Sequence, residues 1–146
     1  MKRILATKSK SLARGFAAIL LVSASLVPFA SADSGEAVLT VDRVSYVSGG
    51  VGTESIDRLN SVARDFNLKL VFALQSGEYV SGVGIVIADT RGRTLLDTTS
   101  DGPWFLAKLP AGNYRVVATF AGKAEKRSIA IGTGAHRTVN FRWASE

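Results

Sequence analysis

Apolar and polar residues follow two different periods along this chain, and each period predicts a different kind of element. From residue 53 to 66 the apolar residues recur at intervals of three and four, which predicts one amphipathic helix. Its apolar face consists of Ile56, Leu59, Val62, Ala63 and Phe66. Thr53 is predicted as the N-cap residue, and Glu54 and Asp57 in the first turn are favourable to the helix dipole.

Downstream of this helix the alternation has a period of two, which is typical of half-buried strands. Seven short strands are predicted, within 66–74, 79–90, 94–99, 104–109, 114–120, 125–131 and 136–143. The residues expected to face inward are Leu68, Leu70, Phe72, Leu74, Val83, Ile85, Ile87, Tyr114, Val116, Ala118, Phe120, Val139, Phe141 and Trp143. The segment 37–49 alternates imperfectly and is expected to form one strand that ends at Gly49. We therefore predict a mainly β fold, a seven-stranded antiparallel β-sandwich with one N-terminal amphipathic helix.

The first 32 residues have the three parts of a secretory signal peptide. A cationic stretch with five Lys or Arg and no acid precedes an apolar run of 13 residues, 15–27. Ala30 and Ala32 then supply the small residues that a signal peptidase requires. The apolar run is shorter than the roughly 20 residues of a membrane-spanning helix, and no Cys follows it for lipid attachment. We expect cleavage near Ala32, a periplasmic or secreted protein, and a mature chain that does not span the membrane.

Removal of this leader changes the charge of the protein. The whole chain carries 18 Lys and Arg against 12 Asp and Glu, a formal net charge of +6. Residues 33–146 carry 13 against 12, a net charge of +1. They contain no cluster of basic and aromatic residues that would follow a phosphate backbone, so nucleic acid is not an expected partner. The chain has no cysteine, which excludes thiol catalysis, Cys-based metal sites and disulfide exchange.

A series of turns and strands between 79 and 141 carries a more specific signal. An Asp-x-x-Gly turn at Asp89 is followed by a Thr-containing strand, an Asp-Gly turn at Asp101, and the motif Leu-Pro-x-Gly-x-Tyr at 109–114. This series resembles the carboxypeptidase-regulatory-like domain of the transthyretin-like (prealbumin-like) group, in a small exported bacterial form. The resemblance implies a Greek-key sandwich, a module that decorates or supports other proteins, and no catalytic residues. With it, the predicted organisation is a signal peptide at 1–32, an N-terminal extension at 33–52, and the helix plus the sandwich domain at 53–146.

The Leu-Pro-x-Gly-x-Tyr motif has a physical reason at each position. Pro110 presets its own backbone angle for a turn, and Gly112 can adopt a positive φ that strains other residues. Tyr114 has the inward parity of Val116 and Ala118, so we expect its ring to pack and its hydroxyl to reach a backbone partner. These reasons concern folding, so the motif indicates a fold and not a chemical activity.

Nucleophilic catalysis is not expected. His136 is the only histidine, and its parity at the start of a strand places it toward solvent. No G-x-S-x-G elbow is present. One hydrolase on a transthyretin-like scaffold, which acts on 5-hydroxyisourate, would require several histidines and a C-terminal Tyr-Arg-Gly-Ser, whereas this chain ends in FRWASE. We predict a protein that is not an enzyme.

Metal and cofactor sites are not expected either. Asp89, Asp97 and Asp101 occupy predicted turns, where an oxygen-rich loop can hold Ca²⁺, but turn aspartates usually bind their own backbone. The stretch GGVGTES leads into the helix as a phosphate loop would, yet it lacks the Gly-Lys-Ser/Thr of that motif. Glu54 and Asp57 would also repel an anion there.

Lys69 and Asn140 are candidates for a Lys–Asn isopeptide bond of the kind formed in pilin-like sandwiches. Their sequence neighbours are apolar and face the core, so both side chains are expected to point outward. This orientation argues against the crosslink.

Four aromatic residues remain as candidates for a binding platform: Tyr79, Trp104, Phe105 and Trp143. Trp104 and Phe105 are adjacent on a strand, so they face opposite ways. We predict an exported, non-enzymatic interaction or accessory module of the cell envelope. The alternative is a carbohydrate- or peptidoglycan-binding domain that uses exposed aromatic residues, and an unpaired edge strand would instead favour binding by strand addition.

Overall fold

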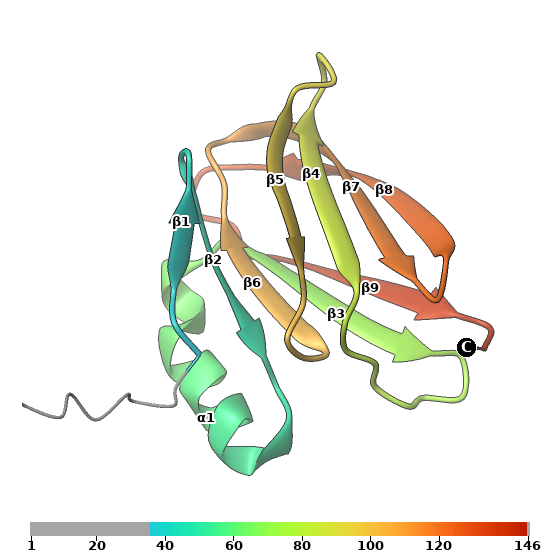
Figure 1. The fold of residues 1–146 in the computed structure, drawn as a ribbon. Coiled ribbons are helices and arrows are strands. Elements are labelled where there is room, and N and C mark those ends of the chain that lie inside the picture. The colour runs from blue at the N-terminus through green and yellow to red at the C-terminus, as the bar shows by residue number, and fades with distance from the viewer. Residues whose placement is uncertain (1–35, 146) are drawn as a thin grey trace, which may run out of the picture. The chain divides into compact units, whose positions relative to one another are not determined.

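The computed structural model of the protein describes residues 36–145, and the signal peptide predicted at 1–32 lies outside the described residues. Two β-sheets and one α-helix make up this part of the chain (Figure 1). The five-stranded sheet has the order β1 (Leu39–Val41), β2 (Val44–Gly49), β6 (Trp104–Lys108), β3 (Leu68–Leu74) and β9 (Arg137–Trp143). The four-stranded sheet has the order β5 (Thr94–Thr99), β4 (Gly84–Asp89), β7 (Gly112–Phe120) and β8 (Lys123–Ile131). The prediction of a mainly β fold with two layers of strands is confirmed.

The strand count differs from the predicted seven, because the described residues form nine strands. The additional strands are β1 and β2, which come from the segment 37–49 where one strand was expected. A tight turn separates them, and Asp42 adopts a positive φ of 54° in it. This turn interrupts the apolar alternation, which is why the segment resembled one irregular strand. The segment predicted as an N-terminal extension thus supplies two strands of the five-stranded sheet.

One strand pair also departs from the antiparallel prediction. β9 runs parallel to β3, in a register that extends from Leu68 opposite Arg137 to Leu74 opposite Trp143. The other strand pairs of the described residues are antiparallel. Alternation predicts which face of a strand is buried but carries no information on strand direction, so this pairing had no signal in the pattern.

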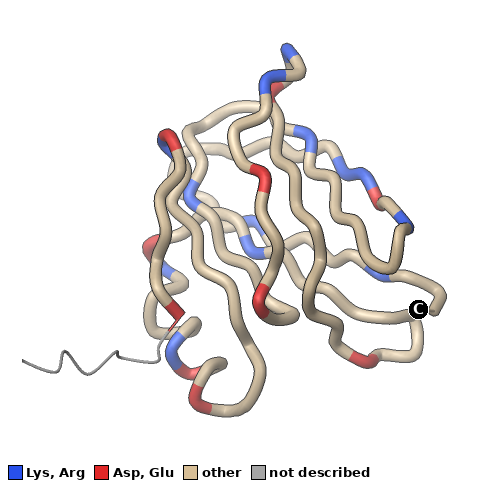
Figure 2. The backbone as a smooth tube through the Cα atoms, in the orientation of Figure 1, with Lys and Arg blue, Asp and Glu red and all other residues tan. Residues whose placement is uncertain are grey.

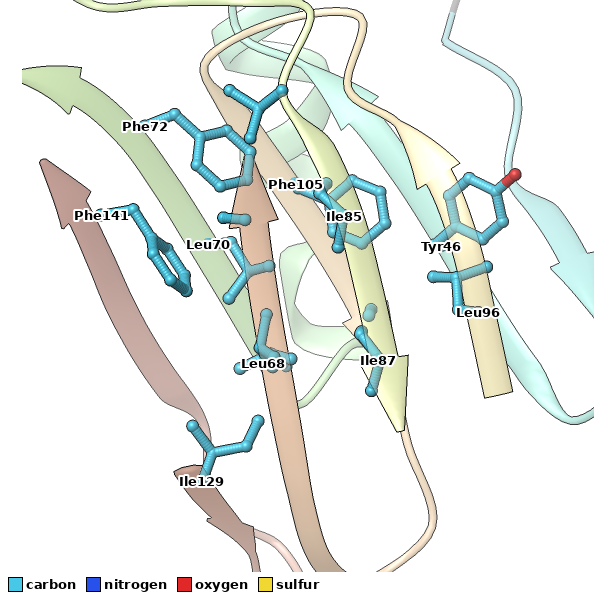
Figure 3. Packing of buried hydrophobic residues seen from close by; sticks show 14 of the residues in the cluster. Tyr46, Leu68, Leu70, Phe72, Ile85, Ile87, Leu96, Phe105, Ile129 and Phe141 are labelled. Atoms are coloured by element: carbon cyan, nitrogen blue, oxygen red, sulfur yellow. The ribbon is translucent and has the colours of Figure 1, made fainter. Parts of the chain in front are cut away.

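The core lies between the two sheets and follows the predicted alternation (Figure 3). Its largest fully buried side chains include Phe72, Phe105 and Phe141. Of the residues predicted to face inward, Phe120 and Val139 are partly buried and pack against the core, whereas the others are buried in it. The predicted inward faces of the strands are therefore confirmed.

A second, smaller core lies between α1 (Gly52–Val62) and the outer face of the five-stranded sheet. Leu59 and Phe66 pack there against Val47 and Leu106. The short 3-10 helix η1 (Ala63–Asp65) continues α1 and leads into β3. The helix therefore covers the side of this sheet that faces away from the four-stranded sheet (Figure 1).

The helix does not begin as predicted, because Thr53 lies inside it and the N-cap is Val51, which forms no side-chain capping hydrogen bond. Gly50 and Gly52 adopt positive φ values of 95° and 80°, and the N-cap lies two residues earlier than predicted. The backbone N–H of Gly50 donates to Ser55 Oγ at 2.7 Å. The side chain of Ser55 thus holds the glycine loop against the first turn of the helix.

Candidate functional site

The structure brings together two of the four aromatic candidates and buries the other two. Phe105 is fully buried between the sheets. Trp143 is also buried, and its indole N–H donates to the carbonyl of Lys123 at 2.9 Å. Trp104 is half-buried on the opposite face from Phe105, as predicted, and Tyr79 is 64 % exposed. Only Tyr79 and Trp104 are therefore available to a ligand.

The register of β3 explains why Tyr79 and Trp104 share one face. Trp104 lies opposite Val71, and Tyr79 forms an isolated antiparallel bridge with Ala73. Val71 and Ala73 alternate with Leu70 and Phe72, which face the core, so both aromatic side chains lie on the outer face of the five-stranded sheet. Tyr79 and Trp104, which are far apart in sequence, therefore lie opposite β3 residues that are only two positions apart.

These aromatic residues line a groove at the N-terminal end of α1, here called the aromatic groove. It has a volume of about 380 Å³, and its lining includes Gly50, Val51, Ile56, Tyr79, Pro103 and Trp104. Val51 is 69 % exposed at its rim, although it is a large apolar residue. A groove of this composition removes apolar groups of a ligand from water, which is its main source of binding free energy.

The glycines before α1 make the aromatic groove possible. A Cβ at Gly50 would lie 3.0 Å from Trp104 Cγ, and the φ of 95° is one that side chains rarely tolerate. A side chain at Gly49 would collide with that of Glu36, and one at Gly102 would collide with the carbonyl of Gly49. The GGVG stretch thus lets the backbone approach the indole closely. Glu36 and Glu54 lie beside this loop, so it does not favour a phosphate group.

Lys69 lies against Trp104. Its Nζ lies 3.3 Å from the centroid of the indole ring, a cation–π contact. Lys69 is half-buried, and the loss of water around the ammonium lowers its pKa. The ion pairs formed among residues 36–145 involve Arg58 and Arg127, so no carboxylate of the described chain neutralises Lys69.

A second groove, here called the basic groove, lies at the C-terminal end of α1 and has a volume of about 290 Å³. Its lining includes Arg64, Phe66, Lys69, Leu106, His136 and Arg137. Phe66 and Leu106 supply apolar surface, and the four others are basic residue types, while no Asp or Glu lines it. The surface of the groove is mostly apolar, and the basic residues border it without a competing carboxylate.

Sequence reasoning missed the basic groove, since Arg64, Lys69 and Arg137 come from η1, β3 and β9. Each of them stands alone in the sequence, and only the packing of α1 across the sheet brings them together. Lys69 was noted only as a candidate for an isopeptide bond with Asn140. In the structure Asn140 is exposed opposite Val71, whereas Lys69 Nζ lies over Trp104, so the two side chains are not brought together. The outward orientation predicted from their parity agrees with these positions.

The remaining candidates form no reaction centre within the part of the chain that the structure describes. His136 is exposed, as predicted, immediately before β9. Asp89 Oδ1 accepts hydrogen bonds from the backbone N–H groups of Arg91 and Arg93, each at 2.9 Å, so it stabilises its own turn. Residues 36–145 contain no group of three His, Asp or Glu side chains arranged to hold a metal ion.

The Leu-Pro-x-Gly-x-Tyr motif has the geometry that its sequence predicts. The hydroxyl of Tyr114 donates to the carbonyl of Pro110 at 2.6 Å, and Gly112 has a positive φ of 157°. Burial of the phenol and the nearby carboxylate of Asp89 raise the pKa of Tyr114. The motif therefore closes a corner of the sandwich.

No protein-family model matches the chain, and no curated protein is recognisably similar to it in sequence. Within residues 36–145, no helix is long and apolar enough to cross a membrane. The function must therefore be argued from the two grooves themselves.

Proposed function

We propose that the protein is an exported, non-enzymatic interaction module of the cell envelope, with a transthyretin-like Greek-key sandwich, that binds a partner protein through the aromatic groove. The observation that carries this proposal is the exposure of Val51 and Tyr79, at 69 % and 64 %, around the half-buried Trp104. A large apolar side chain loses contact with water when a partner covers it, which is worth about 1.5–3 kcal/mol per side chain. The leader pattern of the first 32 residues supports export.

Binding by strand addition is less favoured by the edges of the sheets. β8 is an edge of the four-stranded sheet, and it carries the basic residues Lys123, Lys126 and Arg127 along its length (Figure 2). Charged residues on an edge strand oppose pairing with another chain. β1, an edge of the five-stranded sheet, offers only three residues, Leu39–Val41. The other two edges also carry charged residues, Arg137 and Arg142 in β9 and Asp97 in β5.

A glycan ligand is the second candidate, because Tyr79 is exposed and β9, on the other side of β3, carries polar residues such as Asn140. Sugar rings usually bind by stacking on an open aromatic face. One face of Trp104 is covered by the ammonium of Lys69. Stacking on this indole would require Lys69 to move, so the apolar groove favours a protein segment.

The proposal is tested by site-specific photocrosslinking in the envelope of the native host. A photoreactive phenylalanine analogue replaces Tyr79 in one variant and Arg91, at the tip of the β4–β5 turn, in the control. We expect one discrete crosslinked protein from position 79 and none of that mass from position 91. The same band from both positions, or no protein adduct from position 79, would overturn the proposal. Adducts with glycan strands alone would support the second candidate.

A further inference from the structure

We propose that the aromatic and basic grooves together bind one extended partner segment, with apolar residues beside Tyr79 and Trp104 and acidic residues beside Lys69, Arg64 and Arg137. This inference rests on the proposed function and specifies the chemistry of the partner. The two grooves lie at opposite ends of α1 on the same face of the five-stranded sheet. Trp104 lines the first and Lys69 lines the second, and their cation–π contact joins the two.

The length of α1 sets the length of the segment. An α-helix of 11 residues is about 16 Å long at 1.5 Å per residue. An extended peptide covers that distance with about five residues at 3.3 Å each. One end of such a peptide lies next to Ile56 and Tyr79, and the other lies next to Ala63 and Arg64. A segment of five to seven residues therefore reaches both grooves.

Charge complementarity identifies the residues of the partner at the basic end. Arg58 forms ion pairs with Glu36 and Glu54, and Arg127 forms one with Glu125. The cations that line the basic groove take part in none of the ion pairs of residues 36–145. Asp65 follows Arg64 in the chain but does not line the groove. A carboxylate from a ligand would supply the counter-charge that Lys69 lacks in the described chain.

The hydrogen-bonding groups of the basic groove favour a peptide over a sugar. Asn67 is one of its uncharged polar residues, but both ends of its amide are already used. Its Nδ2 donates to the carbonyl of Leu109 at 2.7 Å, and its Oδ1 accepts from the N–H of Leu109 at 2.9 Å. Sugar hydroxyls require many such donors and acceptors, whereas carboxylates and apolar side chains need the cations and the apolar surface that this groove offers.

Selection from a library of random heptapeptides, displayed on phage, tests this inference on residues 33–146, which form one compact unit. The three baits are the wild type, Lys69→Glu in the basic groove, and Lys126→Glu on the exposed edge strand β8, which changes the net charge equally. We expect wild type and Lys126→Glu to enrich peptides that combine apolar residues at one end with Asp or Glu at the other. A peptide selected on the wild type should bind Lys69→Glu at least 10-fold more weakly, measured by fluorescence anisotropy.

Three results would overturn the inference. These are no enrichment on the wild type, enrichment of apolar residues without acidic ones, and an equal loss of affinity in Lys126→Glu. A fourth is binding of polygalacturonate that depends on Lys69 and exceeds that of every selected peptide, because the site would then be one for acidic glycans. If position 79 still crosslinks to an envelope protein in any of these cases, the interaction module stands and only the chemistry of its partner is wrong.

Discussion

Replacement of Tyr114 by Phe isolates the hydrogen bond that closes the Leu-Pro-x-Gly-x-Tyr corner. The ring is only 7 % exposed and keeps its packing in Phe, so the main loss is the 2.6 Å bond from the hydroxyl to the carbonyl of Pro110. A neutral hydrogen bond contributes about 1 kcal/mol net. Pro110 is exposed, so water can reach its carbonyl in the variant and no further cost arises. We therefore expect a loss of about 1 kcal/mol near pH 7.

The pH dependence of this loss provides a second check. Because the pKa of folded Tyr114 is raised, the unfolded chain loses the phenolic proton first as the pH rises above about 10. The contribution of Tyr114 to stability is therefore complete below that pH and is lost as the pH passes through the raised value. The difference between wild type and Tyr114→Phe should therefore be constant up to about pH 10 and shrink as the pH rises further.

The assay is urea unfolding followed by tryptophan fluorescence, since Trp143 is buried in the core. A loss of about 1 kcal/mol lowers the midpoint by about 0.5–1 M urea at the m-values usual for small domains. The matched control is Tyr79→Phe, whose hydroxyl is on a 64 % exposed residue, and it should change stability by less than about 0.5 kcal/mol. Equal losses in the two variants, or a difference that grows above pH 10, would refute the reasoning.

Three further changes test the packing around the grooves. Gly102→Ala should cost about 3 kcal/mol in urea unfolding, because its Cβ meets the carbonyl of Gly49, whereas Gly132→Ala, with open space around it, should cost nothing; equal effects would contradict the close approach. Leu59→Ala, which empties the fully buried contact beneath α1, should cost about 2–5 kcal/mol and lower the helical signal in circular dichroism; an unchanged midpoint would contradict the second core. Because the pKa of folded Lys69 is lowered, the folded chain loses this proton at a lower pH than the unfolded chain does. The free energy of unfolding therefore rises with pH above the lowered pKa, since the unfolded chain still holds the proton there. Lys69→Met should lack that rise in unfolding measured from pH 8 to 10, and identical pH profiles would contradict the desolvation of Lys69.

Two features could be predicted from the sequence: which face of each strand is buried, and that Trp104 and Phe105 lie on opposite faces. Both depend only on alternation within one strand. Trp104 and Phe105 are adjacent, so one had to leave the core, and the structure places Trp104 outside. The corner at Tyr114 was equally local, since donor and acceptor are four residues apart.

The rest depends on contacts between distant segments. The turn at Asp42 requires a positive φ from a residue other than glycine, and apolar periodicity does not report it. The start of α1 was set by the backbone freedom of Gly50 and by the hydroxyl of Ser55, whereas the sequence favoured Thr53. The basic groove draws on three segments whose residues are ordinary surface cations when read singly. Local pattern therefore predicts the layers, and packing determines the candidate site.

The parallel pair of β3 and β9 has a consequence for the order in which the protein can fold (Figure 1). β3 gains its second neighbour only from residues 137–143, close to the end of the chain. Until these residues are available, Leu70 and Phe72 lie on a strand with one open edge, and the core cannot close over them. For the export that we propose, this delay is an advantage, because an exported chain must remain unfolded while it is threaded across a membrane. Removal of β9 should therefore leave a chain that does not reach a folded, protease-resistant state.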